Sequence, residues 1–141
     1  MGVLALRLGA LNGFISVALG AFGAHGLKKA AFLGDDVERA ARLAWWQTAG
    51  EYQMGHALLL VGIGLLILRL PPNVKSKALS TAALAIPLGL LLFSGSLYVM
   101  TLTGLRVLGA VTPFGGLALL TGWICLFIGA KDLRSPHYSQ S

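Results

Sequence analysis

Four long runs of apolar residues set the main constraint on the fold of this chain. They cover residues 3–24, 45–70, 78–102 and 108–128, and each reaches the roughly 20 helical residues needed to cross the hydrocarbon core of a bilayer. Hydrophobic residues make up 56% of the chain and charged residues 11%, a balance far from that of soluble globular domains. The sequence therefore predicts an all-α fold, an integral membrane four-helix transmembrane bundle over residues 1–134, followed by a polar C-terminal tail over residues 135–141.

A helix start is predicted in the loop between the first two runs. Asp35 and Glu38 have the spacing of a capping box, in which the aspartate accepts from first-turn amides and the glutamate reaches back. The residues that follow are weakly amphipathic, so we expect a short interfacial helical segment between helices 1 and 2, beginning near Asp35. Trp45 and Trp46 then mark the membrane boundary as an aromatic belt.

Small residues recur at intervals of three and four in the first and last spans. Such stripes let helix backbones approach closely, so we expect both to face protein and not lipid. The stripes are Gly9, Gly13, Ser16, Gly20 and Gly23 in the first span, and Gly115, Ala118, Gly122, Cys125 and Gly129 in the fourth.

Polar side chains gather in one half of the predicted membrane region. The second span supplies Gln47, Glu51, Tyr52, Gln53 and His56, while His25, Ser94, Ser96, Tyr98 and Thr112 arrive there from the other spans. Because unpaired polar groups are costly in hydrocarbon, we expect one hydrogen-bonded cluster centred on Glu51. Its expected partners are His56 and Tyr98, with Tyr52 bonded to Thr48 or His56. His25 by itself is explained equally well by the end of a helix, where a cation suits the dipole.

The net charge of +6 does not indicate a nucleic-acid surface. The eleven Lys and Arg residues lie singly or in pairs beside the predicted helix ends, where anionic lipid headgroups attract them. The side that holds the termini has six of them (Arg7, Arg69, Lys75, Lys77, Lys131 and Arg134), and the other side has five (Lys28, Lys29, Arg39, Arg42 and Arg106). The positive-inside rule therefore favours cytoplasmic termini in a multi-pass protein of the bacterial inner membrane.

The sequence predicts no catalytic residue, metal site or cofactor. No two histidines are one turn apart, and a lone cysteine supplies no Cys-based metal framework. Glu51 and His56 are separated by about 140° around a helix, so they do not face one ligand from one helix. Ser94 and Ser96 lack the strand-turn-helix context of a hydrolase nucleophile. An enzyme is therefore the least supported class of function.

Four motifs occur in an order and spacing that resemble one known family. They are Gly20-Ala21-Phe22-Gly23-Ala24-His25; Thr48 with Glu51-Tyr52-Gln53 and His56; Phe93-Ser94-Gly95-Ser96-Leu97-Tyr98; and Thr112-Pro113 with Gly115-Gly116 and Gly122-Trp123. Together they resemble the domain of unknown function 423 family of small bacterial inner-membrane proteins with mitochondrial relatives. The resemblance implies a four-span membrane protein and supplies no activity.

Two classes of function stay open at this point. The first is a non-enzymatic accessory bundle that binds lipid or another hydrophobic ligand, with membrane lipids, another membrane protein or a second copy of the chain as partner. The alternative is a small proton- or cation-coupled transporter that uses Glu51, because an intramembrane carboxyl group can exchange a proton for a cation. A sealed and fully paired Glu51 favours structural glue, a water-filled vestibule favours transport, and a lateral opening favours a hydrophobic ligand such as a lipid or quinone.

Overall fold

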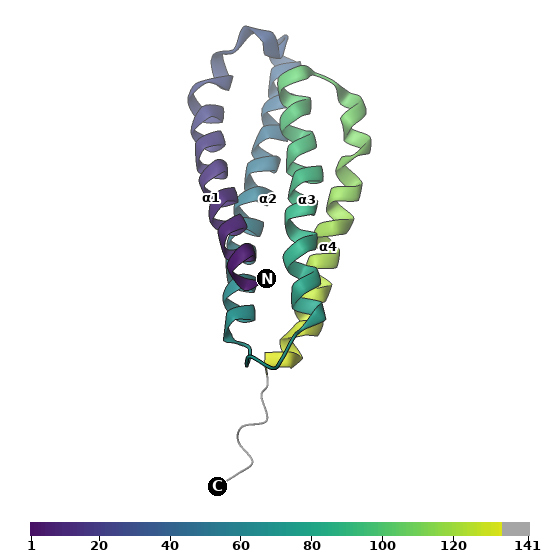
Figure 1. The fold of residues 1–141 in the computed structure, drawn as a ribbon. Helices are drawn as coiled ribbons and strands as arrows, with labels where there is room; N and C mark the ends of the chain where they lie inside the picture. Colours follow the sequence, from purple (N-terminus) through teal and green to yellow (C-terminus); the bar gives the residue numbers. More distant parts are fainter. Residues whose placement is uncertain (134–141) are drawn as a thin grey trace.

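The computed structural model describes residues 1–133 as an all-helical molecule (Figure 1). Its long helices are α1 (Gly2–His25), α2 (Asp36–Arg69), α3 (Lys77–Thr103) and α4 (Thr112–Gly129). Short 3₁₀ turns connect or extend them: η1 (Leu27–Lys29), η2 (Ala31–Leu33), η3 (Arg106–Ala110) and η4 (Ala130–Leu133). The predicted polar tail at residues 135–141 lies outside the described residues.

Within residues 1–133, four helical segments are long and apolar enough to cross a membrane. They are Gly2–Lys29, Asp36–Arg69, Lys77–Thr103 and Arg106–Leu133. Large apolar side chains are exposed on these helices, including Phe14 (73% exposed), Leu91 (70%) and Phe127 (84%). In water, a protein with such a surface would aggregate, whereas lipid solvates the exposed apolar side chains. The predicted four-helix transmembrane bundle is confirmed.

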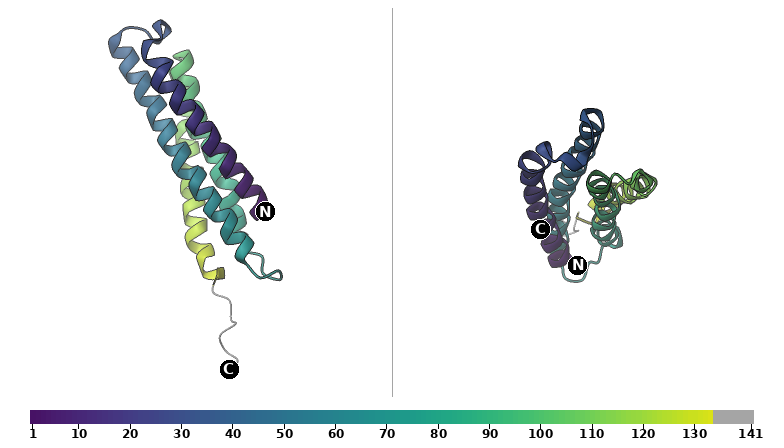
Figure 2. Two further views of the ribbon diagram at one scale, coloured as in Figure 1. Left: turned by 90° about the vertical axis from the view of Figure 1, so that its left-hand side faces the viewer. Right: turned by 90° about the horizontal axis from the view of Figure 1, so that it is seen from above.

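Consecutive helices are antiparallel neighbours. α1 packs along α2, α2 along α3 and α3 along α4, and the view from above in Figure 2 shows the α1–α2 pair beside the α3–α4 pair. The main core contains the buried residues Ala5, Leu60, Ile63, Ala82, Ala83, Ile86, Leu90 and Leu119. α2 and α3 thus occupy the centre of the bundle, with α1 and α4 flanking them.

The contact between α1 and α2 repeats every seven residues along α1. Gly2, Gly9, Ser16 and Gly23 are all buried there. A Cβ added to Gly9 would lie 2.8 Å from the backbone nitrogen of Val61, so only glycine permits this approach. This seven-residue spacing is the helix-packing repeat of left-handed bundles. In α4, Gly115 lies against the backbone of Phe93 and Gly122 against the side chain of Ile86.

Two members of the predicted stripe on the first span do not contact another helix. A Cβ added to Gly13 or Gly20 would meet nothing within 4 Å. Each lies four residues after a contact residue, which rotates it about 40° past the line of contact. The expectation that the whole stripe faces protein is therefore wrong for Gly13 and Gly20, and it holds for Gly9, Ser16 and Gly23.

The start of α2 follows the predicted cap, and the helical segment predicted to begin near Asp35 is present and continuous with the second span. Asp35 is the N-cap, and its carboxylate accepts from the backbone amide of Glu38 at 2.9 Å. From Asp36 the helix runs unbroken to Arg69. No helix break separates an interfacial piece from the span, because residues 36–46 contain no proline or glycine to interrupt it. The predicted segment forms the first turns of α2.

Arg42 joins three segments at the loop end of the bundle. Its guanidinium donates to the Glu38 carboxylate at 2.7 Å, to the carbonyl of Phe32 at 3.5 Å and to the carbonyl of Thr101 at 3.4 Å. The Thr101 hydroxyl donates back to the Arg42 carbonyl at 3.0 Å. Gly104, which ends α3 with a φ of 75°, leaves room for the guanidinium. Arg42 therefore holds the first loop and α2 against the end of α3.

Candidate ligand-binding groove

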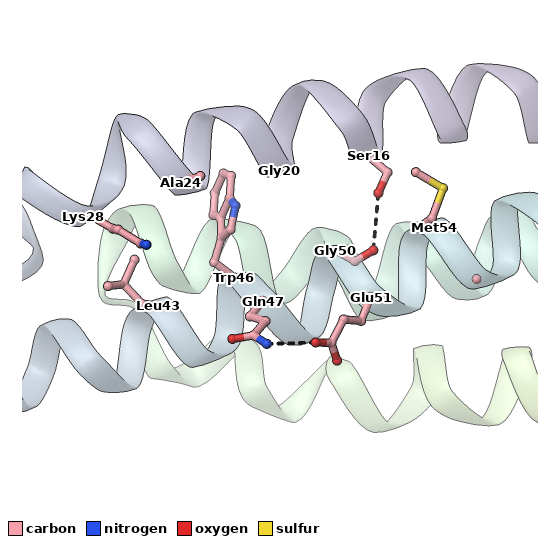
Figure 3. Close-up of a pocket in the computed structure, with 12 residues that line it drawn as sticks. Ser16, Gly20, Ala24, Lys28, Leu43, Trp46, Gln47, Gly50, Glu51 and Met54 are labelled. Carbon is pink, nitrogen blue, oxygen red and sulfur yellow. Dashed lines mark hydrogen bonds between the residues drawn. The ribbon is translucent and has the colours of Figure 1, made fainter.

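A groove of about 650 Å³ runs between α1 and α2 near the loop end of the bundle (Figure 3). Its walls are mainly apolar or glycine surfaces. The residues lining it are Ser16, Gly20, Gly23 and Ala24 of α1, Lys28 of η1, and Leu43, Trp46, Gln47, Gly50, Glu51, Met54 and Gly55 of α2. The groove therefore lies along one side of the contact between the two helices.

Missing side chains create the open space of this groove. Gly20 on α1 and Gly55 on α2 both line it, and a Cβ at either position would meet nothing within 4 Å. The helices remain in contact beside it, because the Ser16 hydroxyl donates to the carbonyl of Gly50 at 3.3 Å. The Trp46 indole nitrogen donates to the carbonyl of Leu19 at 3.0 Å, which fixes the ring between the helices. Figure 3 shows this ring standing between α1 and α2.

Glu51 lies in this groove and not in a buried cluster. Its side chain is exposed, and its Oε1 accepts a hydrogen bond from the Gln47 amide at 2.9 Å, within the same helix. No hydrogen bond joins Glu51 to His56 or Tyr98 among the described residues. The predicted cluster centred on Glu51 is therefore wrong. Glu51 is about 160° around α2 from Ala49, the residue that packs against α3, so it points away from the bundle interior.

Gln53 is the centre of the interhelical network. It is 6% exposed, its amide nitrogen donates to Asn12 Oδ1 of α1 at 3.4 Å, and its Oε1 accepts from the Tyr98 hydroxyl of α3 at 2.8 Å. The Tyr98 ring packs edge-on against Trp46 with centroids 4.6 Å apart. Asn12 also donates to the Leu8 carbonyl at 2.9 Å. The network joins α1, α2 and α3. The sequence signal for the role of Asn12 is its polar amide within an otherwise apolar span.

His56 connects α2 with α4 on another face. Its Nδ1 lies 2.8 Å from the Tyr52 carbonyl, and its Nε2 accepts from the Trp123 indole at 3.1 Å. We assign the neutral Nδ1–H tautomer because it satisfies both contacts. The Tyr52 ring stacks on Phe93 with centroids 4.4 Å apart and on the His56 ring at 5.7 Å. Of the two contacts expected for Tyr52, the one with His56 is present. His56 Nδ1 lies beside the Tyr52 carbonyl, and the two rings stack.

The remaining predicted residues form separate contacts. Ser94 donates to the Ala49 carbonyl at 2.9 Å, and the Ser96 and Thr112 hydroxyls are 2.8 Å apart, which links α3 to α4. His25 is exposed in the last turn of α1. The polar residues therefore form several small interhelical links instead of one cluster. Within residues 1–133 no group of three or more His, Cys, Asp or Glu side chains could hold a metal ion.

Comparison with known proteins places the chain in one family. The model of the family described as "Protein of unknown function (DUF423)" matches residues 19–116. The chain belongs to this family. It is 40% identical over 134 residues to the UPF0382 inner membrane protein YgdD of Escherichia coli, covering 95% of this chain and 94% of that protein. No solved structure matches the chain.

A second relative comes from another bacterium. The chain is 39% identical over 122 residues to a UPF0382 membrane protein of Staphylococcus saprophyticus, covering 86% of this chain and 92% of that one. The family resemblance, the membrane class and the multi-pass inner-membrane location predicted from the sequence are thus confirmed. The description of the family assigns it no activity.

Proposed function

We propose that this protein is a non-enzymatic, membrane-embedded binding bundle that holds the apolar chain of a membrane amphiphile in the groove between α1 and α2. The observation that carries the proposal is the place of this groove, between two spans and about opposite the face of α2 that packs on α3. A groove on the outer side of a transmembrane bundle opens laterally, so its ligand arrives from the bilayer. Its volume of about 650 Å³ lies within the range of roughly 300–1,000 Å³ found for small-molecule sites.

The two open glycines support this function. Glycine within a helix costs up to about 1 kcal/mol relative to alanine. At Gly9 that cost is offset by close packing, but Gly20 and Gly55 have no neighbour that requires a missing side chain. What these two glycines provide is the open space of the groove.

The apolar core favours binding over transport. A transporter that uses Glu51 needs a path for water or ions past this residue and through the bundle. Beyond the Gln53 network the centre is filled by residues such as Leu60, Ile63 and Ile86, each fully buried. Glu51 itself faces the groove, so its position supports recognition of a ligand from the lipid.

The test fills the groove without disturbing the helix contacts. Gly20→Leu and Gly55→Leu place a side chain in open space, so both variants should keep the thermal stability of the parent in detergent. Gly62→Leu is the matched control, because Gly62 lies on α2, also meets nothing within 4 Å and does not line the groove. The measurement is quenching of Trp46 fluorescence by a single-chain phospholipid with a brominated chain, with Trp45 and Trp123 replaced by phenylalanine in every protein, since Trp46 is the tryptophan that forms part of the groove.

We expect quenching in the parent protein and in Gly62→Leu, and a large loss in both groove variants. Equal quenching in all four proteins would show that the bromine atoms approach from the general lipid surface, and the proposed function would then be wrong.

A further inference from the structure

We infer that the groove selects a single-chain phospholipid with a free glycerol hydroxyl, a lysophospholipid, whose phosphate binds Lys28 and whose hydroxyl binds Glu51. This inference rests on the proposed function and adds the chemistry of the head group. It follows from the two opposite charges on the groove, from their order along it, and from the limited space beside them.

Both charges are available to a ligand. Lys28 and Glu51 line the same groove, yet neither takes part in an ion pair within residues 1–133. One oxygen of Glu51 accepts from Gln47, and the other has no hydrogen-bond partner among the described residues. An intramembrane carboxylate is costly unless it is paired, so a ligand that donates a hydrogen bond to it gains binding energy there.

The two charged groups lie at different depths. Lys28 belongs to η1, beyond the end of α1, and lies at the outer end of the groove with Leu43 of α2. Glu51 is eight residues after Leu43 on α2, which places it about 12 Å deeper. Figure 3 shows the Lys28 side chain extending along the groove from its outer end, with Glu51 further along α2. Met54 and Gly55 follow beyond Glu51 and are free of charge. The groove therefore presents a cation, then an acceptor, then an apolar section.

A lysophospholipid has matching groups in the same order. Its phosphate is outermost and accepts from the Lys28 ammonium, which extends on a flexible four-carbon stem. Its glycerol hydroxyl comes next and donates to the Glu51 carboxylate, and its one acyl chain continues past Gly55. A neutral monoacylglycerol lacks the phosphate, and a diacyl phospholipid has esterified the hydroxyl, so each loses one of the two contacts.

The shape of the groove also favours one chain. The Ser16–Gly50 hydrogen bond and the Trp46 ring against Gly23 close the floor of the groove, so a chain cannot pass between the helices. Gly20 and Gly55 add open width to the groove, because no neighbouring atom lies within 4 Å of the place where a Cβ would be. A second chain would have to lie outside, on the lipid-exposed surface.

The experiment measures binding of four lipids to the full chain in maltoside detergent by native mass spectrometry. They are a 1-acyl lysophosphatidic acid, its analogue lacking the glycerol-backbone hydroxyl, the matching monoacylglycerol and the diacyl phosphatidic acid. We expect the lysophospholipid to bind about tenfold more tightly than each of the other three, the size expected for one charge-assisted hydrogen bond or for exclusion of the second chain.

Variants assign each contact to one residue. Glu51→Leu should remove the preference over the analogue without the hydroxyl and keep the preference over monoacylglycerol. Lys28→Gln should remove the preference over monoacylglycerol and keep the preference over the analogue without the hydroxyl. Lys28→Arg should retain binding. Arg106→Gln, which removes an exposed cation outside the groove, should change nothing.

The possible outcomes separate the two proposals. If all the single-chain lipids bind equally and Gly55→Leu abolishes their binding, the groove binds chains but the head-group inference is wrong. Stronger binding of the diacyl lipid would also overturn the inference. If Gly55→Leu has no effect on any lipid, the proposed function itself fails.

Discussion

The Tyr98 hydroxyl of α3 donates a 2.8 Å hydrogen bond to Gln53 Oε1 of α2, inside the membrane-spanning part of the bundle. Gln53 also donates to Asn12 of α1, so one amide connects three helices. Such a contact stabilises the arrangement of the helices because the alternative is an unsatisfied polar group in hydrocarbon.

We expect Tyr98→Phe to lower the free energy of unfolding by about 0.6–1.7 kcal/mol, between the average and the largest contribution measured for hydrogen bonds between transmembrane helices. The check is a double-mutant cycle with Gln53→Leu, followed by unfolding of each variant in mixed micelles. A double variant that loses less stability than the sum of the two single variants would support the link, since the double variant leaves neither partner unsatisfied. Strictly additive effects would show that the hydrogen bond contributes nothing.

The centre of this network could not be chosen from the sequence. Glu51 and Gln53 are two residues apart on α2, and two residues rotate a helix by about 200°. Which of them faces the interior depends on where α1 and α3 approach, and that is set by contacts such as Gly9 with Val61. The high free-energy cost of an unpaired carboxylate in hydrocarbon led us to expect Glu51 to be buried and paired. The fold instead exposes Glu51 in the groove and buries the uncharged amide of Gln53.

Glycines that look alike in sequence should respond differently to substitution. Gly9→Leu would drive a side chain into Val61 and the Ala57 carbonyl, 2.9 Å from the added Cβ, and overpacking of this kind typically costs about 1–3 kcal/mol or more. Gly13→Leu would enter open space and should leave the melting temperature in detergent nearly unchanged. A matching loss of stability in both variants would contradict the assignment of the contact line on α1.

The span boundaries and the small-residue signal were predictable because they depend on length, composition and local spacing. The groove was not. Gly20 has the same spacing from Ser16 as Gly13 has from Gly9, yet only Gly20 lines the groove. That difference arises from the partner helix, because the antiparallel register places Gly20 between the levels of Trp46 and Gly50 and places Gly13 near Gln53.

Loss of the Arg42 guanidinium should destabilise the first loop more than the membrane spans. Arg42→Gln removes the donors to the Phe32 and Thr101 carbonyls and leaves Glu38 without its ion pair. Because Glu38 is partly exposed, water compensates in part, and we expect a loss of about 1–3 kcal/mol. Hydrogen exchange should then accelerate in residues 27–34 and at the end of α3, while amides near Ile63 stay protected. Unchanged exchange in the loop would show that Leu27 and Leu33, both fully buried, hold it without Arg42.

The positive-inside count predicts cytoplasmic termini, which would place the groove in the outer leaflet. A fluorescent protein fused after Ser141 should then fold and fluoresce in cells, whereas alkaline phosphatase fused at the same point should be inactive. The reverse result would move the groove to the cytoplasmic leaflet and leave its geometry unchanged. The count differs by only one residue between the two sides, so Arg106→Glu is a useful partner variant that should strengthen the same orientation.

The contact between His56 and Trp123 is the one side-chain hydrogen bond that joins α2 to α4 in the described part of the chain. It assigns the proton of the neutral imidazole to Nδ1, which lies 2.8 Å from the Tyr52 carbonyl. Nitrogen-15 spectra of the histidine-labelled protein should therefore show the Nδ1–H tautomer for His56. Trp123→Phe removes the donor but keeps an aromatic ring near His56, so the Nε2 resonance should shift while the helical content is retained. His25 provides the internal control, because it lies in the last turn of α1 and should not respond. An unchanged His56 spectrum in Trp123→Phe, or an Nε2–H tautomer in the parent protein, would show that α2 and α4 are not linked in this way.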